Sequence, residues 1–337
     1  MTLSLANHEA SLPVAYRLYL PEDWAKDQAR RDKAKIPQTI AFQTKPEIAL
    51  EQIKAARTAG LPQGVVLMDA GYGNDTELRT AITTLGMSYV AGIAGTTTVW
   101  PPGAAPLLPQ TRSGRGRPQT RLQRDSEHQP ISAKALALSL STEAWETVAW
   151  REGSAERLSS RFARQRVRAA HRDTELSQPR AEECLLIEWP EDEKEPTKYW
   201  LATLPEEIAF DRLVDLAKLR WRIERDYQEL KQELGLGDYE GRGWRGFHHH
   251  ASLCIAAYGF LIAERGALPP SGSAFSAPLA RSAIPEGYRP RGAADPARTA
   301  HPQLDRDGAQ TAHRRTRQNP PEVPLLQYTH PQGAEDS

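Results

Sequence analysis

The sequence lacks an excess of charge of either sign. Its 43 Lys and Arg residues are matched by 43 Asp and Glu residues, so the formal net charge at pH 7 is +0. Overall charge therefore does not favour a polyanionic partner such as nucleic acid, and any binding of this kind depends on local basic patches. Long apolar runs are also missing. The most apolar stretch, residues 251–263, is too short to span a bilayer.

Cysteine is nearly absent. Cys184 and Cys254 are the only two, and their spacing fits neither a metal-ligand motif nor a disulfide framework. Such sparse usage is typical of a reducing compartment. The residues after Met1 contain neither the basic segment nor the apolar core of a signal peptide. We therefore expect a cytoplasmic protein.

What is present is an ordinary globular composition, with 39% hydrophobic and 26% charged residues in a chain of 337. The first part of the chain alternates between strand and helix signals, and Thr44-Lys45-Pro46-Glu47 is a typical helix start with a capping hydroxyl. This alternation predicts an α/β fold. Strand signals lie at residues 2–5, 14–20, 65–68 and 87–93, and helix signals at 44–59 and 77–85.

Three segments of different character follow. Residues 95–209 combine a loop rich in Pro, Gly, Ser and Arg with scattered strand signals, which we interpret as a β-rich insertion. Residues 210–265 hold one long helix over 210–234, with an apolar stripe and no Gly or Pro, and a second helix over 247–265. Residues 266–337 carry 11 of the 26 prolines and no sustained apolar periodicity, so we expect a disordered tail.

Asp69 is the first candidate for chemistry. It follows the apolar run at 65–68 and precedes two glycines, Gly71 and Gly73. Ligands of open α/β sheets bind at the carboxyl ends of strands, and a carboxylate there suits Mg²⁺, which prefers hard oxygen ligands. The alternative is an aspartate that only caps a turn or a helix, and the position alone leaves both interpretations open.

Arg220, Glu224 and Lys231 are the second candidates. They fall at spacings of four and seven, so they share one face of the helix expected over 210–234. The plain alternative is an exposed ladder of ion pairs worth roughly 0.2–0.5 kcal/mol each. Arg220, however, lies on the apolar row of that helix. A partly buried arginine requires an anionic partner such as a carboxylate or a phosphate.

Two basic segments are candidates for nucleic-acid contact. One lies in the loop within residues 101–129, and the other, residues 240–250, reads Glu-Gly-Arg-Gly-Trp-Arg-Gly-Phe-His-His-His. Its three histidines point in different directions on a helix, so one metal ion cannot take all of them. The side chains that suit phosphate and base contacts are Arg112, Arg115, Arg117, Arg242, Trp244 and Arg245.

Three separated motifs, "AYRLYLPEDWA", "VVLMDAGYGND" and "LRWRIERDYQELKQELGLGDYEGRGWRGFHHH", resemble DDE-class transposases of bacterial insertion sequences. The closest group carries a Tyr-Arg-Glu-Lys signature around its catalytic glutamate. The resemblance covers roughly residues 2–290. It implies an RNase H-like catalytic core, a mixed sheet flanked by helices, with residues 1–94 as its first part, 95–209 as the β-rich insertion and 210–265 as the closing helices.

The resemblance also implies a site. Asp69 and Glu224 would be catalytic carboxylates that bind metal, and Arg220 and Lys231 would be the signature residues that contact the phosphates of the transposon end. The implied cofactor is Mg²⁺ in a two-metal site, with Mn²⁺ as a substitute. The implied partners are transposon ends and target DNA, bound by a homodimer assembled on DNA, at the bacterial nucleoid.

Departures from the family pattern shape the functional hypothesis. Ala217 stands at the signature's tyrosine position, the tail stops resembling the family, and the strand with the family's first catalytic aspartate lies upstream of residues 2–5. We therefore expect a transposase-like protein, truncated at the N-terminus, that is inactive because the first aspartate is absent. The alternatives are a non-catalytic DNA-binding remnant that interferes with full-length transposase, and an unrelated α/β protein whose charged helix is an interaction surface.

Overall fold

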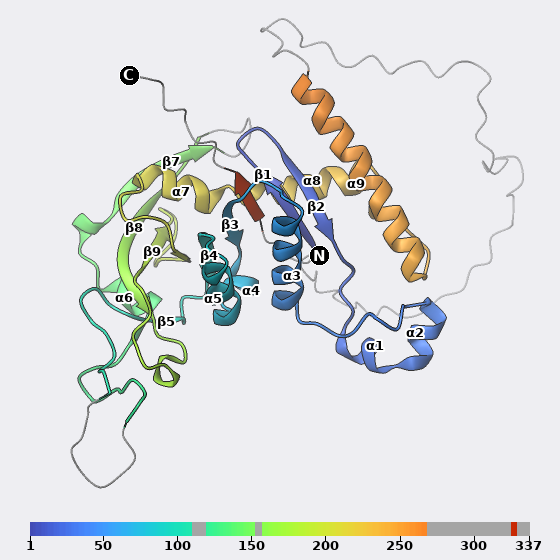
Figure 1. Cartoon of the computed structure of the whole chain (residues 1–337). Coiled ribbons are helices and arrows are strands. Elements are labelled where there is room, and N and C mark those ends of the chain that lie inside the picture. Colours follow the sequence, from blue (N-terminus) through green and yellow to red (C-terminus); the bar gives the residue numbers. More distant parts are fainter. Residues whose placement is uncertain (110–118, 152–156, 268–324, 329–337) are drawn as a thin grey trace, which may run out of the picture. The chain divides into compact units, whose positions relative to one another are not determined.

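The computed structural model describes residues 1–109, 119–151, 157–267 and 325–328 (Figure 1). The chain divides into two compact units, one formed by Met1–Ala263 with Pro321–Ser337 and the other by Glu264–Pro320. The described strands all belong to the first unit, as do the described candidate site residues.

A mixed β-sheet organises the first unit. Its strands follow the order β2-β1-β11-β3-β4-β10-β9-β8-β5-β6, and β7 pairs with β8. β3 and β4 run parallel, whereas β10, β9 and β8 each run antiparallel to the preceding strand in this order. The bounds are β1 (Thr2–Ala6), β2 (Ser11–Tyr16), β3 (Gly64–Met68), β4 (Tyr89–Ile93), β5 (Thr98–Trp100), β6 (Ile131–Ser132), β7 (Glu146–Arg151), β8 (Arg157–Ala169), β9 (Glu183–Trp189), β10 (Lys198–Ala202) and β11 (Leu325–Tyr328).

Helices cover both faces of this sheet. The capping box expected at the start of α3 is present, because the Thr44 hydroxyl accepts from the Glu47 amide and the Glu47 side chain accepts from the Thr44 amide. The bounds are α1 (Glu22–Lys26), α2 (Gln28–Ala34), α3 (Lys45–Thr58), α4 (Ala70–Gly73), α5 (Thr76–Thr84), α6 (Ala133–Leu138), α7 (Phe210–Lys218), α8 (Trp221–Gln232) and α9 (Trp244–Ala267), with 3₁₀ turns at Thr142–Ala144 and Asp173–Glu175. Together the mixed sheet and its helices confirm the expected α/β class.

The core lies in two clusters, one on each face of β3. Val66 and Met68 point into a cluster that includes residues of α3, α5 and α6, while Val65 and Leu67 point into one that includes residues of α7 and α8. A strand that is buried on both faces reads as a continuous apolar run. Burial on both faces therefore explains the continuous apolar run at residues 65–68. It also means that β3 ends, just before Asp69, between two layers of helices.

The strands within residues 95–209 extend the same sheet. β10 pairs with β4 through Trp200 opposite Gly92, and β9 and β8 follow outward from β10. The segment expected as a β-rich insertion is thus hydrogen-bonded directly to the first α/β segment. Its standing as a separate domain remains a prediction.

The prediction of a single long helix over residues 210–234 is wrong, because the structure has two helices there. α7 ends at Lys218 and α8 begins at Trp221, with Leu219 and Arg220 between them. The amide of Ile223 bonds to the carbonyl of Arg220 at 3.1 Å, a tighter turn than the α-helix uses. Leu219 and Ile223 are both buried in the same cluster, so core packing favours this turn although the sequence has no Gly or Pro there.

β11 lies within the tail that was expected to be disordered, and for these four residues that expectation is wrong. β11 runs parallel to β1 and antiparallel to β3, and it joins the two in the middle of the sheet (Figure 1). Main-chain pairing needs no particular side-chain periodicity, so hydropathy gave no sign of it. The rest of the tail lies outside the described residues.

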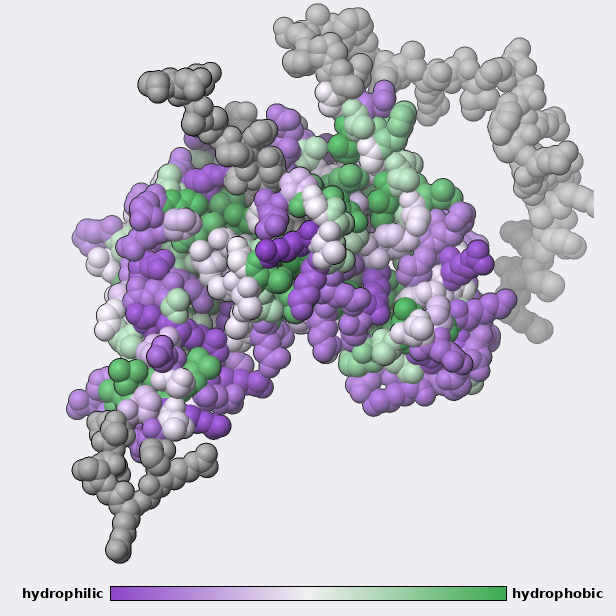
Figure 2. All heavy atoms as spheres, viewed as in Figure 1, coloured by the Kyte–Doolittle hydropathy of each residue, from purple (hydrophilic) through white to green (hydrophobic). Residues whose placement is uncertain are grey.

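Apolar side chains gather on the exposed part of α9 in the surface view (Figure 2). The largest are Leu253, Phe260 and Leu261, which are 58%, 63% and 39% exposed. Despite this apolar surface, the described part of the chain contains no helix long and apolar enough to cross a membrane.

Candidate active site

Asp69 marks the end of β3 and the start of α4. Its Oδ1 accepts hydrogen bonds from the amides of Gly71, at 2.8 Å, and Tyr72, at 3.2 Å. Asp69 is therefore a helix cap, as the plain interpretation proposed. Both of these hydrogen bonds end on Oδ1, whereas Oδ2 faces an arginine from another part of the chain.

Two glycines allow α4 to pack directly on β4 beside Asp69. A Cβ on Gly92 would lie 3.1 Å from the Ala70 nitrogen and 3.3 Å from the Asp69 carbonyl carbon. A Cβ on Gly73 would overlap the carbonyl oxygen of Gly92. This close backbone approach holds the Asp69 carboxylate at the carboxyl end of β3, where open α/β sheets bind ligands.

Arg220 joins Asp69 to Glu224. Its Nη1 lies 3.4 Å from Asp69 Oδ2, and its Nη2 donates to Glu224 Oε1 at 2.9 Å. The Arg220 side chain is 25% exposed, Asp69 10% and Glu224 69%. The break between α7 and α8 lies at Arg220 itself. The sequence-based expectation that Arg220 has an anionic partner is confirmed, and the partner is a pair of carboxylates.

These three residues line a pocket of about 460 Å³. Lys198, Lys218, Trp221 and Ala217 also line it. The pocket thus combines two carboxylates, several cations and an aromatic ring. Lys and Arg side chains and aromatic rings recognise phosphate groups and stacked bases, whereas carboxylates bind cations.

Sequence reasoning missed a buried ion pair at this pocket. Lys218 Nζ lies 2.6 Å from both carboxylate oxygens of Glu188, and the two side chains are only 9% and 3% exposed. The same ammonium lies 4.2 Å from the ring centroid of Trp150, a cation–π contact. The signal was Glu188 itself, a carboxylate that follows the apolar run Cys184–Ile187 within β9.

The remaining candidates lie elsewhere. Lys231 is exposed, lies 5.8 Å from the Tyr227 ring centroid and does not line the pocket. Arg242 and Arg245 are exposed near the start of α9, and the half-buried Trp244 stacks on His248 with ring centroids 4.5 Å apart. The basic cluster Arg112, Arg115 and Arg117 lies outside the described residues.

The acidic side chains present fit a cation only in part. Across the described residues, no group of three or more His, Cys, Asp or Glu side chains could hold a metal ion. Mg²⁺ is commonly bound through one or two carboxylates together with substrate phosphates and waters. Asp69 and Glu224 match that smaller protein contribution, provided that Arg220 turns from the carboxylates toward a phosphate.

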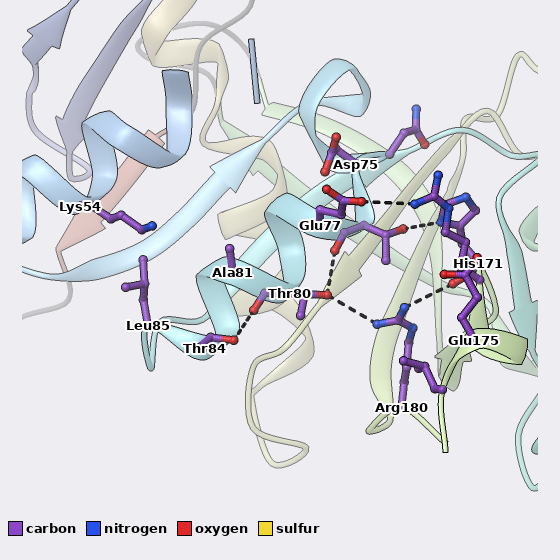
Figure 3. A pocket seen from close by; sticks show the side chains of 14 residues that line it. Lys54, Asp75, Glu77, Thr80, Ala81, Thr84, Leu85, His171, Glu175 and Arg180 are labelled. Atoms are coloured by element: carbon purple, nitrogen blue, oxygen red, sulfur yellow. Dashed lines mark hydrogen bonds and ion pairs between the residues drawn. The ribbon is translucent and has the colours of Figure 1, made fainter. Parts of the chain in front are cut away.

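A larger pocket, of about 680 Å³, lies apart from these carboxylates (Figure 3). Figure 3 shows Arg180 and His171 on one side and Lys54 on the other, and Thr76 Oγ1 lies 3.0 Å from His171 Nδ1. Its lining contains as many carboxylates as Lys and Arg side chains, so charge does not indicate a ligand.

Comparison with known families gives a match, which covers the first part of the chain. Residues 1–157 match the family model described as DDE superfamily endonuclease. The match covers just under half of the 337 residues and includes Asp69, while Arg220 and Glu224 lie beyond it. No curated protein is similar enough to the chain to count as a match. The family match supports a DDE-type nuclease or transposase relationship, and the mixed sheet flanked by helices is consistent with a DDE nuclease fold.

Proposed function

We propose that this protein is a transposase-like DNA nuclease that cleaves and joins DNA strands with a divalent metal ion. The observation that carries this proposal is the Arg220 guanidinium bound to both Asp69 and Glu224 in one pocket. Two carboxylates and a cation suit a phosphodiester, whose charge must be neutralised during displacement at phosphorus. The match to a DDE endonuclease family over residues 1–157 supports this reaction class, and DNA as its substrate.

Each side chain has a proposed role. Asp69 and Glu224 hold the metal, for which Mg²⁺ is the proposed ion and Mn²⁺ a substitute, and Arg220 turns onto a phosphate of the bound strand. When bound, the metal supplies activation of the attacking hydroxyl and charge stabilisation at the leaving oxygen. Lys231, Arg242, Trp244 and Arg245 contact DNA outside the pocket. We further propose a homodimer assembled on transposon ends and target DNA at the bacterial nucleoid, as an insertion-sequence transposase would act.

A second function is DNA binding without cleavage. It is favoured by the number of carboxylates, since among the described residues only Asp69 and Glu224 bring carboxylates to the pocket, and both are already paired with Arg220. A protein of this kind would occupy DNA ends and interfere with an active transposase. We also propose that the chain has an RNase H-like core. Under this second function, the chain is inactive as a nuclease.

One experiment separates the two functions. Labelled duplexes that carry the DNA flanking this reading frame are incubated with the purified protein in Mg²⁺, Mn²⁺ or EDTA. For the nuclease we expect metal-dependent nicking that Asp69→Asn and Glu224→Gln each reduce by at least about 100-fold. Glu233→Gln, an exposed glutamate at the end of the same helix, is the matched control and retains the activity.

Binding without nicking by the wild-type protein, unchanged by either metal, would establish the second function. Nicking that persists in both site variants would overturn the assignment of Asp69 and Glu224.

A further inference from the structure

Three arginines of β8 form a row on one face of the sheet. Arg164, Arg166 and Arg168 are two positions apart, so their side chains leave the same face, at intervals of about 6.6 Å. Phe162 belongs to the same alternation and is buried in the cluster that α7 and α8 cover. The arginine row therefore continues the α7–α8 side of the sheet beyond its apolar core.

A single carboxylate partly neutralises the row. Glu182 Oε1 lies 3.1 Å from Arg168 Nη2, and Glu182 Oε2 lies 3.9 Å from Arg166 Nε. Arg164 instead donates to the Ile208 carbonyl at 2.9 Å, and its guanidinium stacks 5.4 Å from the Phe210 ring centroid. Backbone and ring contacts orient Arg164 without cancelling its charge, so the row keeps a net positive charge.

The row also has unused donors. Each guanidinium carries five N–H groups in a planar fork. Within the described residues, the Nε of Arg166 is buried and has no hydrogen-bond partner, with Glu182 Oε2 3.9 Å away. Buried donors of a charged group are costly to leave unpaired. The oxygens of a phosphate provide the bidentate acceptors that a guanidinium fits.

Strand register relates the row to the candidate site. Arg164 pairs with Leu186, Leu186 with Trp200 and Trp200 with Gly92, which packs against Asp69. Four steps between adjacent strands, at about 4.8 Å each, place the two ends of this path roughly 19 Å apart. One turn of a DNA duplex is longer, at about 34 Å. A duplex bound at the carboxylate pocket therefore extends far enough to reach the row.

The plain interpretation is a solvated face of the sheet, where exposed ion pairs contribute little to stability. Glu206 and Glu207 lie close by in sequence, just before Ile208, yet within the described residues neither forms an ion pair with the row. An unbalanced row of regularly spaced arginines is better suited to a regularly spaced polyanion.

We propose that Arg164, Arg166 and Arg168 form a phosphate-binding row that holds the backbone of double-stranded DNA beside the Asp69–Glu224 pocket. The identity of the ligand rests on the proposed function, but binding by the row does not depend on cleavage. The row contacts phosphates only, so it contributes affinity and orientation without sequence preference.

The test is the salt dependence of DNA binding. Fluorescence anisotropy of a labelled duplex, recorded in EDTA over a series of salt concentrations, gives the slope of log K against log salt. Replacing all three arginines by glutamine should reduce that slope by up to about 2.7, since each phosphate contact contributes about 0.9. At about 0.1 M salt this corresponds to a loss of affinity of roughly 10²–10³-fold, on every duplex sequence.

Two matched variants accompany it. Lys26→Gln, Arg30→Gln and Lys33→Gln on α1 and α2 remove the same charge elsewhere and should leave the slope unchanged. Arg164→Lys, Arg166→Lys and Arg168→Lys keep the charge and should retain most of the slope. If the triple glutamine variant does not fold, Arg166→Gln alone should lower the slope by about 0.9.

If the triple glutamine variant of the row kept the wild-type slope of log K against log salt, the proposal would be overturned. An equal reduction of that slope in the α1–α2 variant would overturn it as well. Because EDTA excludes metal-dependent cleavage, this outcome is independent of the nicking assay. If the protein binds DNA through the row but does not nick it, the proposed nuclease function is refuted and the phosphate-binding role of the row is supported.

Discussion

Arg220 and Asp69 are 151 positions apart in the chain, and Arg220 Nη1 lies 3.4 Å from Asp69 Oδ2. The same guanidinium holds Glu224, so one cation joins the two carboxylates of the proposed site. This arrangement makes the arginine a competitor of any metal ion for the same oxygens. Phosphate binding removes the competition, because it offers the guanidinium another anion.

Arg220→Gln should therefore increase stabilisation by divalent cations. We expect the variant without metal to lose about 1 kcal/mol of unfolding free energy, since a partly buried charged hydrogen bond is lost. Mg²⁺ or Mn²⁺, at ten times its dissociation constant for the variant, should then raise the unfolding free energy of the variant by about 1.4 kcal/mol. The same ion concentration should stabilise the wild type by less. Thermal unfolding with and without metal measures both effects. Adding Glu224→Gln should abolish the gain, and equal metal effects in wild type and variant would contradict the competition.

The stability of the fold should depend on pH through Asp226. This carboxylate is 6% exposed and accepts from Tyr258 Oη at 2.9 Å and from Ser11 Oγ, while Arg222 and Glu229 act on it from the same helix. Burial raises the pKa of Asp226 from 3.8 to about 6. The folded protein thus binds the proton more tightly than the unfolded chain does.

The sign follows from this raised pKa. Tighter proton binding at Asp226 stabilises the fold fully below about pH 4, and this stabilisation is lost as the pH rises through about 6. The unfolding free energy therefore falls by up to about 3 kcal/mol over this range. Urea unfolding across this range measures the decline. Asp226→Asn should flatten the profile, whereas Asp211→Asn, an exposed aspartate on α7, should leave its slope in place. An unchanged slope in Asp226→Asn would show that another group is responsible.

The Lys218–Glu188 pair should show strong coupling. Breaking a buried pair leaves one poorly compensated charge, so Lys218→Met and Glu188→Leu should each cost up to about 3–5 kcal/mol, with the longer contact from Lys198 Nζ to Glu188 Oε2, at 3.9 Å, reducing the cost of Lys218→Met. The double variant should cost much less than their sum, because both charges are removed. A double-mutant cycle by urea unfolding measures the coupling. The exposed pair Lys26–Glu22, at 2.7 Å, is the comparison and should couple by no more than about 0.5 kcal/mol. Additive costs at Lys218 and Glu188 would contradict the prediction.

Gly73→Ala should disturb the Asp69 cap. The added methyl overlaps the backbone carbonyl of Gly92, which cannot move aside as a flexible side chain would. We expect a loss of about 1–3 kcal/mol in unfolding free energy, typical of overpacking, and weaker metal-dependent stabilisation. Gly243→Ala, where no atom lies within 4 Å of the added Cβ, is the matched control. Equal stabilities of the two variants would refute the close packing of α4 on β4.

Local chemistry made part of this architecture predictable. Thr44 and Glu47 form the capping box that their spacing indicates, and the apolar run at 65–68 is a strand buried on both faces. Patterns of this kind depend on neighbouring residues only. The break between α7 and α8 was not predictable, because no Gly or Pro marks it and its cause is the burial of Leu219 and Ile223 against distant strands.

The site was predictable to a similar extent. The position of Asp69 after an apolar run was compatible with a ligand at the carboxyl end of the strand or with a cap, and the place of Arg220 on an apolar row indicated an anionic partner. Neither pattern showed that the partner was Asp69 as well as Glu224. Lys231 shares their helical face in sequence, but the structure places it outside the pocket, since it lies two turns further along α8.

The sequence by itself determined the α/β class, the strand that ends before Asp69 and the four-residue spacing that brings Arg220 to Glu224, because these depend on periodicity and capping within short windows. Tertiary structure alone decided that β11 enters the middle of the sheet, that Glu188 pairs with Lys218, and that the β8 arginines reach the level of Asp69. Strand register and long-range packing set these relationships. Both arise from the free energy of the whole core, which no short window of sequence contains.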